Sequence, residues 1–313
     1  MTNFLLKRLL TGAVMLFSVS FLSYFLLYLG TGNVAILILG LQAAPADIAA
    51  LNEQLGINRP FLEQYFSWLG NALRLDLGQS WSSPERVSEA LFPRLRVTLT
   101  IVVITTLLAL LISVALGTLA ALRGGWIDRV VQFLSLFGFA VPGFLVAFYL
   151  AILLAIQFPI FNAVGYTNFS DNPSEWFKSV TLPVIALALA GVAAASQQTR
   201  RAVKEALAMD YVRTLRARGL TFRRVIFKHV LRNEGGPILA IIGVQFVGML
   251  GGAILVEQIF AIPGLGPYAV SATTMGDIPS IMGLVTVTAL IVIIMNLLVE
   301  LTSAALNPKI RLS

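Results

Sequence analysis

The chain has 313 residues, of which 58% are hydrophobic and only 12% are charged, and its mean hydropathy is +0.86. A soluble domain has about 45–50% apolar and about 25% charged residues, because water must hydrate its surface. The composition therefore excludes an ordinary soluble protein and indicates that lipid covers much of the surface. Cysteine is absent and His229 is the single histidine. These counts exclude a disulfide framework, a thiolate metal site and a histidine-rich metal cluster.

Apolar stretches of roughly 20 residues, long enough to cross a bilayer as a helix, occur about six times. They cover about residues 9–29, 97–122, 130–158, 180–196, 237–256 and 281–305. The sequence thus predicts an all-α, polytopic membrane protein with about six transmembrane helices, forming a single transmembrane domain over residues 1–313. The first stretch exceeds a signal-peptide core and ends in GTGN, which is not a typical cleavage site, so we expect it to be retained.

The net charge of +7 fits either nucleic-acid binding or a membrane topology signal, and the positions of the charges decide between them. A cytoplasmic N-terminus places sixteen of the 22 lysine and arginine residues on the inner side. The six outer ones are Arg59, Arg74, Arg86, Arg94, Arg96 and Lys178. Because cytoplasmic loops carry an excess of basic residues, we expect both termini to be cytoplasmic. This topology leaves no need for nucleic acid as a partner.

Two connecting segments are too long to be simple turns. The first, residues 30–93, is expected outside the cell and contains two predicted short helices, residues 45–55 and 60–73. Each begins at a proline, and Gly56 closes the first, which is the usual punctuation of a helix. An irregular stretch through residues 76–78 follows. The segment is interpreted either as a packed extracytoplasmic cap or as a surface that helps to shape a substrate path.

The second long segment, residues 199–236, is expected in the cytoplasm and is strongly basic. Its first half has helical character that stops at Gly219, a residue that readily adopts positive φ. Apolar residues recur at helical spacing after this break, which predicts a helix–turn–helix. The residues alone leave two interpretations open: a basic helix held by anionic lipid headgroups, or a docking site for a cytosolic protein. A span on each side disfavours nucleic-acid binding.

The string D-Y-V-R-T-x-R-A-x-G-L, followed by H-x-L-R-N and a proline, makes this segment specific. It resembles the cytoplasmic loop of ABC importer permeases, and more narrowly of their dipeptide, oligopeptide and nickel branch. In that family the loop contains the coupling helix, which docks onto an ATP-binding subunit. The docking residues that the resemblance implies are Asp210, Tyr211, Val212, Arg213, Thr214, Arg216, Ala217, Gly219 and Leu220. Further matches are His229, Leu231, Arg232, Asn233 and Pro237.

The resemblance covers most of the chain. It extends to residues 55–60, 64–69, 76–80, 257–266 and 307–311. The chain departs from the family in four places: residues 29–33 lack the P-G-D-P element, and Leu215 replaces an alanine. Residues 234–236 replace an apolar run, and residues 300–303 replace the pattern D-L-x-Y.

The resemblance implies a type I ABC importer permease fold in a bacterial cytoplasmic (inner) membrane. The chain would form, with a second homologous permease, a path for di- or oligopeptides that operates by alternating access. Two ATP-binding subunits would bind ATP and Mg, and an extracytoplasmic peptide-binding protein would deliver substrate. No cofactor is expected on this chain, and the substrate-binding residues stay open.

Enzymatic activity and ion-coupled transport are the rival functions. None of the five lysines follows a glycine, so the phosphate-binding loop of an ATPase is missing. An intramembrane enzyme would need a nucleophile–base or metal constellation, which the spans lack. A secondary transporter places ionisable residues at mid-membrane, whereas Glu257 and Glu300 are expected near span ends.

Three features inside the expected spans carry weaker expectations. Gln245 and Asn296 are interpreted as hydrogen-bonding groups between helices, with substrate contact as the alternative. Gly248 and Gly252, four residues apart, are expected to allow close helix packing.

Overall fold

The computed structural model describes residues 2–30 and 34–306 of the chain. The expectations for residues 31–33 and 307–313 lie outside the described residues. The described part is built from helices joined by turns, with an isolated β-bridge between Gln79 and Arg86. This architecture confirms the predicted all-α class.

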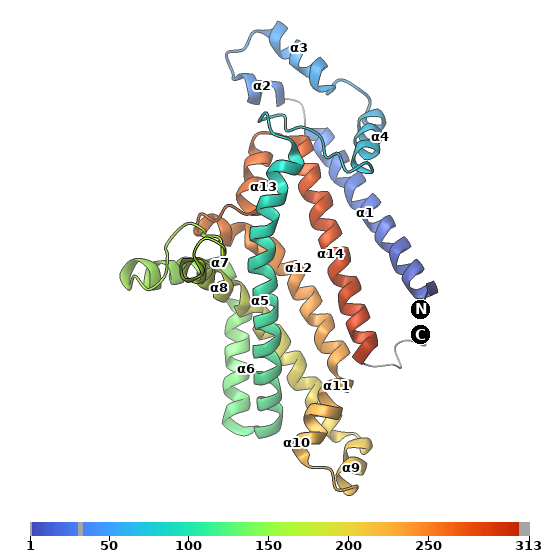
Figure 1. Cartoon of the computed structure of the whole chain (residues 1–313), viewed down its shortest axis with the longest axis vertical. Coiled ribbons are helices and arrows are strands. Elements are labelled where there is room, and N and C mark those ends of the chain that lie inside the picture. The colour runs from blue at the N-terminus through green and yellow to red at the C-terminus, as the bar shows by residue number, and fades with distance from the viewer. Residues whose placement is uncertain (1, 31–33, 307–313) are drawn as a thin grey trace. The chain divides into compact units, whose positions relative to one another are not determined.

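The chain folds into two compact units, Met1–Val97 with Pro263–Ile293 and Thr98–Ile262 with Ile294–Ser313. The first unit contains α1 (Thr2–Gly30), α2 (Val34–Leu39), α3 (Pro45–Leu55), α4 (Phe61–Ala72), α13 (Leu265–Thr274) and the first parts of α5 (Val87–Arg123) and α14 (Ile278–Leu306). Figure 1 shows α2, α3 and α4 near the C-terminal end of α1. The two helices predicted in residues 30–93 are therefore present, whereas α2 and α13 were not anticipated.

The second unit contains the remaining helices. These are α6 (Gly125–Ala140), α7 (Gly143–Leu150), η1 (Ala151–Gln157), α8 (Pro173–Ala208), α9 (Asp210–Ala217), α10 (Phe222–Arg224), η2 (Val225–Val230), α11 (Leu231–Asn233) and α12 (Gly235–Ile259), together with the later parts of α5 and α14. Here η1 and η2 are short π-helical segments.

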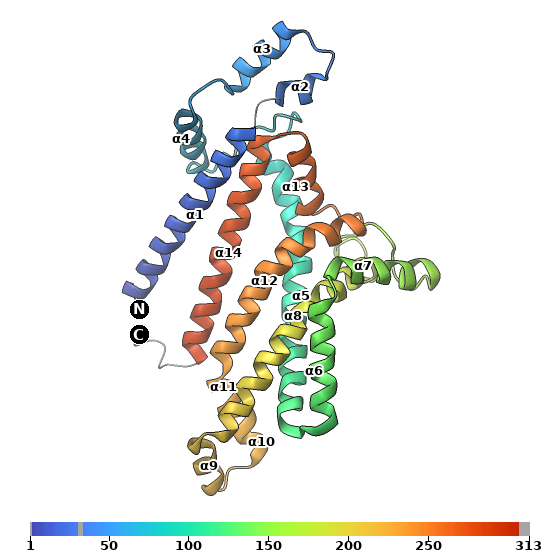
Figure 2. The same cartoon turned by 180° about the vertical axis from the view of Figure 1, so that it is seen from behind.

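Five helices of the described chain are long and apolar enough to cross a membrane, and a bent pair adds a sixth candidate. The pair is Gly125–Ala140 with Gly143–Gln157, which meet at 95° (Figure 2). The expected continuous span over residues 130–158 is therefore wrong. Pro142 explains the break, because it has no N–H for the helical ladder and forces Val141 into an extended conformation.

Helix α8 is the centre of the second unit, with 72% of its apolar stretch buried. Neighbouring helices approach it at glycines, where a Cβ atom would collide. A Cβ atom on Gly117 of α5 would lie 2.6 Å from the Ser196 carbonyl oxygen, and one on Gly138 of α6 would lie 2.8 Å from Ala193 Cβ. Small residues are the usual means by which membrane helices pack closely.

The glycine pair singled out in the sequence contributes less to this packing. A Cβ atom on Gly248 would meet no other atom within 4 Å among the described residues. A Cβ atom on Gly252 would lie 3.3 Å from Leu187 Cδ2. The expectation of close packing at this pair is therefore wrong for Gly248.

In the first unit, the aromatic residues of α4 pack against α1. Tyr65 is fully buried, and its hydroxyl lies 3.0 Å from the Ser20 hydroxyl. The Tyr65 ring also meets the Phe21 ring edge to face, with centroids 5.2 Å apart. This packing supports the interpretation of residues 30–93 as an ordered cap.

A buried carboxylate holds a turn within this cap, at residues 80–82. Asp277, between α13 and α14, accepts hydrogen bonds from the hydroxyls of Ser80, Ser82 and Ser280 and from the Trp81 amide. Burial alone would raise the pKa of the Asp277 carboxyl, but these hydrogen bonds favour the ionised form more strongly. Its pKa therefore lies below the usual value.

We predict that Gly117→Ala destabilises the protein, because the added methyl group has no space between α5 and α8. Overpacking of this kind costs about 1–3 kcal/mol. Thermal unfolding of the purified protein in detergent should show a lower midpoint than the wild type. Gly248→Ala, with open space at its Cβ, is the matched control and should leave the midpoint unchanged. Equal midpoints for both variants would contradict close packing at Gly117.

Candidate functional site

The chain leaves α8 at Met209, whose extended backbone (φ −73°, ψ 148°) separates α8 from α9. Figure 1 shows α9 and α10 beyond the end of α8, on the side where α5 turns into α6. The expected loop 199–236 is partly helical continuation, because α8 runs to Ala208 and α12 begins at Gly235. The part that lies between these long helices is residues 209–234.

One face of α9 is fixed to the protein by apolar contacts. Val212 is 3% exposed, and Tyr211, Leu215 and Leu220 are half-buried around it. The buried residues in the same cluster are Val203, Ala206, Val225, Ile226 and Val230. The base of this structure is therefore a small hydrophobic core shared by α8, α9 and η2.

The opposite face of α9 points into solvent. Its exposed residues are Asp210, Arg213, Thr214, Arg216 and Ala217, with Gly219 just beyond. All nine residues that the sequence predicts for docking thus lie on α9 or its C-terminal turn, six exposed and three facing the core.

Electrostatic interactions on this exposed face are weak. Arg213 Nη1 lies 3.5 Å from Asp210 Oδ1, and these side chains are 78% and 94% exposed. Such surface pairs contribute little to stability. Arg216 lies over the Phe222 ring at 5.6 Å. The N–H donors of Arg213 and Arg216 on this exposed face are therefore not paired with a buried acceptor of α9.

Gly219 ends α9 with the backbone geometry expected from the sequence. Its φ is +81°, and its amide donates to the Arg216 carbonyl oxygen at 2.9 Å. The Leu220 amide donates to the Leu215 carbonyl oxygen at 3.3 Å. These two bonds form a Schellman motif, which requires a left-handed residue at this position. The predicted break at Gly219 is confirmed.

A charged cluster links α8 to α6 about two to three turns before α9 begins. Arg200 donates to Asp128 through Nε and through Nη2, the latter at 2.7 Å, and Lys204 Nζ donates to Asp128 Oδ2 at 2.9 Å. The side chains of Asp128 and Arg200 are 12% and 17% exposed. A two-pronged arginine–carboxylate pair of this kind fixes orientation as well as distance. We call Asp128, Arg200 and Lys204 the inner clasp.

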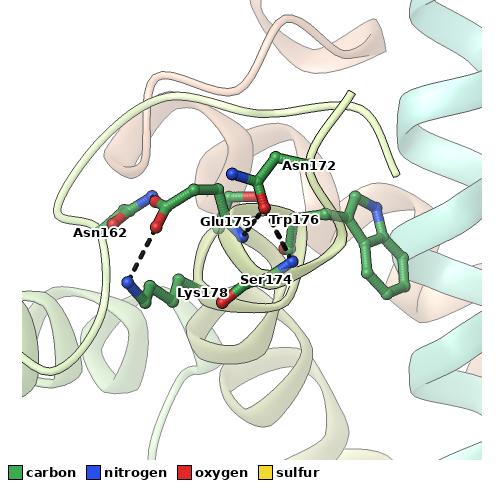
Figure 3. A network of polar contacts seen from close by, with 7 residues as sticks. Asn162, Asn172, Ser174, Glu175, Trp176 and Lys178 are labelled. Atoms are coloured by element: carbon green, nitrogen blue, oxygen red, sulfur yellow. Dashed lines mark hydrogen bonds and ion pairs between the residues drawn. The ribbon is translucent and has the colours of Figure 1, made fainter. Parts of the chain in front are cut away.

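At the other end of α8, hydrogen bonds order the preceding loop (Figure 3). The Asn172 side chain caps α8 by accepting from the amides of Ser174 and Glu175, at 3.1 and 3.2 Å. Glu175 accepts from Lys178 Nζ at 2.8 Å and from Asn162 Nδ2 at 3.1 Å. Capping by asparagine is a strong helix-start signal, and here it ties residues 162–172 to α8.

The remaining polar candidates are scattered. Glu257 is 1% exposed near the C-terminal end of α12 and accepts from the Thr98 hydroxyl at 2.5 Å. Gln245 is half-buried on α12, and Asn296 is exposed on α14. Among the described residues, no group of three or more metal-ligating side chains is close enough to hold an ion. The arrangement therefore offers a short helix with an exposed cationic face beyond the end of α8.

Two descriptions of known protein families match the chain. Residues 113–312 match "Binding-protein-dependent transport system inner membrane component". Residues 1–102 match the description of the N-terminal part of such a membrane component. The two matches together cover nearly all of the residues that the structure describes.

Related proteins match over almost their full length. A probable peptide ABC transporter permease of Sinorhizobium fredii is 33% identical over 309 residues, 98% of this chain and 99% of the relative. The oligopeptide transport system permease AppB of Bacillus subtilis is 33% identical over 314 residues, 99% of each protein.

Among solved structures, a chain of the MetNI methionine ABC transporter in an inward-facing conformation gives a TM-score of 0.55 at 13% identity. The alignment covers 70% of this chain and 97% of that chain. At this identity the likeness concerns the fold alone, and it confirms the expected type I importer permease fold.

We predict that Gly219→Val loosens α9, whereas Gly219→Asn does so much less. Within residues 2–30 and 34–306, no non-neighbouring atom lies within 4 Å of a Cβ at this position, so the cost is conformational only. Asparagine tolerates the left-handed region, while a β-branched residue does not. Hydrogen exchange of the α9 amides should accelerate by about tenfold or more in the valine variant, corresponding to about 1–2 kcal/mol. Wild-type exchange in Gly219→Val would show that the Schellman motif does not hold α9.

Proposed function

This chain belongs to the family of binding-protein-dependent transport system inner-membrane components, and from that premise we propose that it is the permease subunit of an ATP-driven peptide importer. Both relatives described above carry names of peptide transport permeases, and they match from end to end. Family membership also removes the support for a secondary transporter. Peptides are the proposed substrate class, with glutathione, nickel chelates and oligosaccharides as alternatives.

The observation that carries the proposal is the division of α9 into a buried and an exposed face. Val212 anchors the helix, whereas Arg213 and Arg216 project from it. An arginine fork suits carboxylates and carbonyl oxygens on a protein partner. We propose that α9 and its C-terminal turn dock onto an ATP-binding subunit through the exposed residues. Tyr211, Val212 and Leu220 face the hydrophobic core. They therefore support docking by holding α9 in place rather than by contacting the ATP-binding subunit.

The ATP-dependent step is assigned to partner subunits. The chain lacks a phosphate-binding loop of the type G-x-x-x-x-G-K-[ST]. The proposed assembly therefore has two ATP-binding subunits, which bind ATP and Mg, and a second homologous permease. An extracytoplasmic peptide-binding protein completes it.

The proposed location is a bacterial cytoplasmic membrane, with both termini and residues 199–236 in the cytoplasm. The distribution of lysine and arginine supports this orientation. Residues 30–93 then lie outside, and residues 1–313 act as one permease domain. The lipid bilayer surrounds the apolar faces.

The inner clasp would connect a movement of α9, through α8, to α6. Closure of the ATP-binding subunits would displace α9, and α8 would follow because both share one hydrophobic core. Asp128 would transmit this displacement to α6, because Arg200 and Lys204 of α8 both bind it. Alternating access would result from α6 and α8 moving together.

Co-purification followed by transport measurement tests the proposal. We expect the tagged chain, extracted in mild detergent, to recover a second permease and ATP-binding subunits by mass spectrometry. The double variant Arg213→Glu and Arg216→Glu should lose the ATP-binding subunits, because its exposed face then repels acidic groups. Arg201→Glu, an equally exposed position on α8, is the control and should retain them.

The recovered complex, with its binding protein, should accumulate a labelled oligopeptide in vesicles only when ATP is supplied. Purification of the chain only with itself, under conditions that keep known importers intact, would contradict the docking role. Uptake of a nickel chelate or an oligosaccharide but no peptide would reject the substrate class.

A further inference from the structure

A cavity of about 610 Å³ opens in the first unit beneath α3 and α4. Its walls come from α1, α3, α4, the turn of residues 77–81 and the start of α14. This volume lies within the range of about 300–1,000 Å³ that small-molecule sites occupy. We call it the α3–α4 cavity.

Within the part of the chain that the structure describes, the residues that line the cavity carry positive charge and no negative charge. Arg59 is the single charged residue among the described residues that line the cavity, and none of them is acidic. The amide side chains around it are Gln54, Gln64, Asn71 and Gln79. The rings of Tyr24, Trp68 and Trp81 supply apolar wall. One cation, several neutral amides and flat aromatic surface suit an organic anion that also carries peptide groups.

The turn that presents Arg59 is held in place by side-chain hydrogen bonds. Gln64 Nε2 donates to the carbonyl oxygens of Ile57 and Arg59, at 2.9 and 2.8 Å. Gly56, with φ +70°, closes α3 immediately before this turn. The position of the Arg59 backbone is therefore built into the fold rather than left to a loose loop.

Arg59 has only a weak partner of its own. Its Nη1 atom lies 3.6 Å from Glu63 Oε1, longer than a normal hydrogen bond, and both side chains are more than half exposed. An exposed pair of this kind contributes little. Glu63 does not line the cavity, so it competes with a ligand for Arg59 without blocking the space.

We propose that the α3–α4 cavity binds short peptides outside the membrane by pairing their C-terminal carboxylate with Arg59. The side-chain amides of Gln54 and Asn71 hydrogen-bond to the peptide groups, and the aromatic rings pack against the peptide side chains. The site holds substrate on the outer side of the membrane. The inference rests on the proposed peptide substrate, but it concerns a site within this chain alone.

Binding of a fluorescent tripeptide to the full complex in lipid nanodiscs, with the binding protein washed away, tests the site. The free acid should bind, and the C-terminal amide of the same tripeptide should bind about tenfold to a hundredfold more weakly, as expected for loss of a charge-assisted hydrogen bond. Arg59→Gln should weaken the free acid by a similar factor. It should leave the affinity of the amide unchanged, because the lost interaction is the same one.

Two further variants separate this pairing from bulk electrostatics. Arg74→Gln removes one positive charge from the same segment outside the cavity and should leave affinity unchanged. Glu63→Gln removes the competing carboxylate and should tighten binding of the free acid. If amidation of the peptide and Arg59→Gln weaken binding additively, the proposal is overturned. It is also overturned if Arg74→Gln weakens binding of the free acid as much as Arg59→Gln does. Absence of saturable tripeptide binding to the wild type would also overturn it.

The test also distinguishes this site from the proposed transport function. ATP-dependent uptake of a peptide by a complex that fails the binding test would reject the cavity site alone. Arg59-dependent binding in a complex that takes up no peptide would support the site and reject peptide transport.

Discussion

The second unit depends on how firmly α8 is bound to its neighbours. Two kinds of contact bind it to α5 and α6: close backbone approach at Gly117 and Gly138, and the inner clasp from Arg200 to Asp128. Close packing resists compression but permits sliding, whereas a bidentate ion pair also fixes direction. Breaking such a pair by removing one partner leaves a poorly solvated charge, so the clasp resists separation of the helices. Together these contacts hold α6 and α8 side by side in a fixed orientation.

The firm attachment of α8 to its neighbours matters because α9, with its exposed face, is fixed to α8. A helix of eight residues has little stability in isolation, because helix nucleation is costly. Val212 and the core around it supply the missing stabilisation, and Gly219 ends the helix without strain. The arginines on the outer face are then presented by a preorganised surface that shares its core with α8. The same principle operates in the first unit, where Gln64 and Asp277 fix turns by multiple hydrogen bonds.

The sequence predicted features that follow from local chemistry. Apolar length located the spans, and the αL preference of glycine located the end of α9 at Gly219. Pro142 is a local signal for the bend, but the span over residues 130–158 was predicted from apolar length alone. The inner clasp was not predictable, because Asp128 and Arg200 are 72 residues apart and meet only after α6 packs on α8. The close contact at Gly117, rather than Gly248, likewise depends on which helix faces which.

Pulsed electron paramagnetic resonance tests the central claim, that α6, α8 and the α9–η2 structure move as one body. The chain has no cysteine, so spin labels can be placed at Leu136→Cys on α6 and Phe227→Cys on η2, both exposed and outside the clasp. We expect the same distance distribution in the nucleotide-free complex and the ATP-bound complex, and a broader, nucleotide-dependent distribution after Asp128→Asn. A shift of several ångströms between nucleotide states with the clasp intact would contradict it.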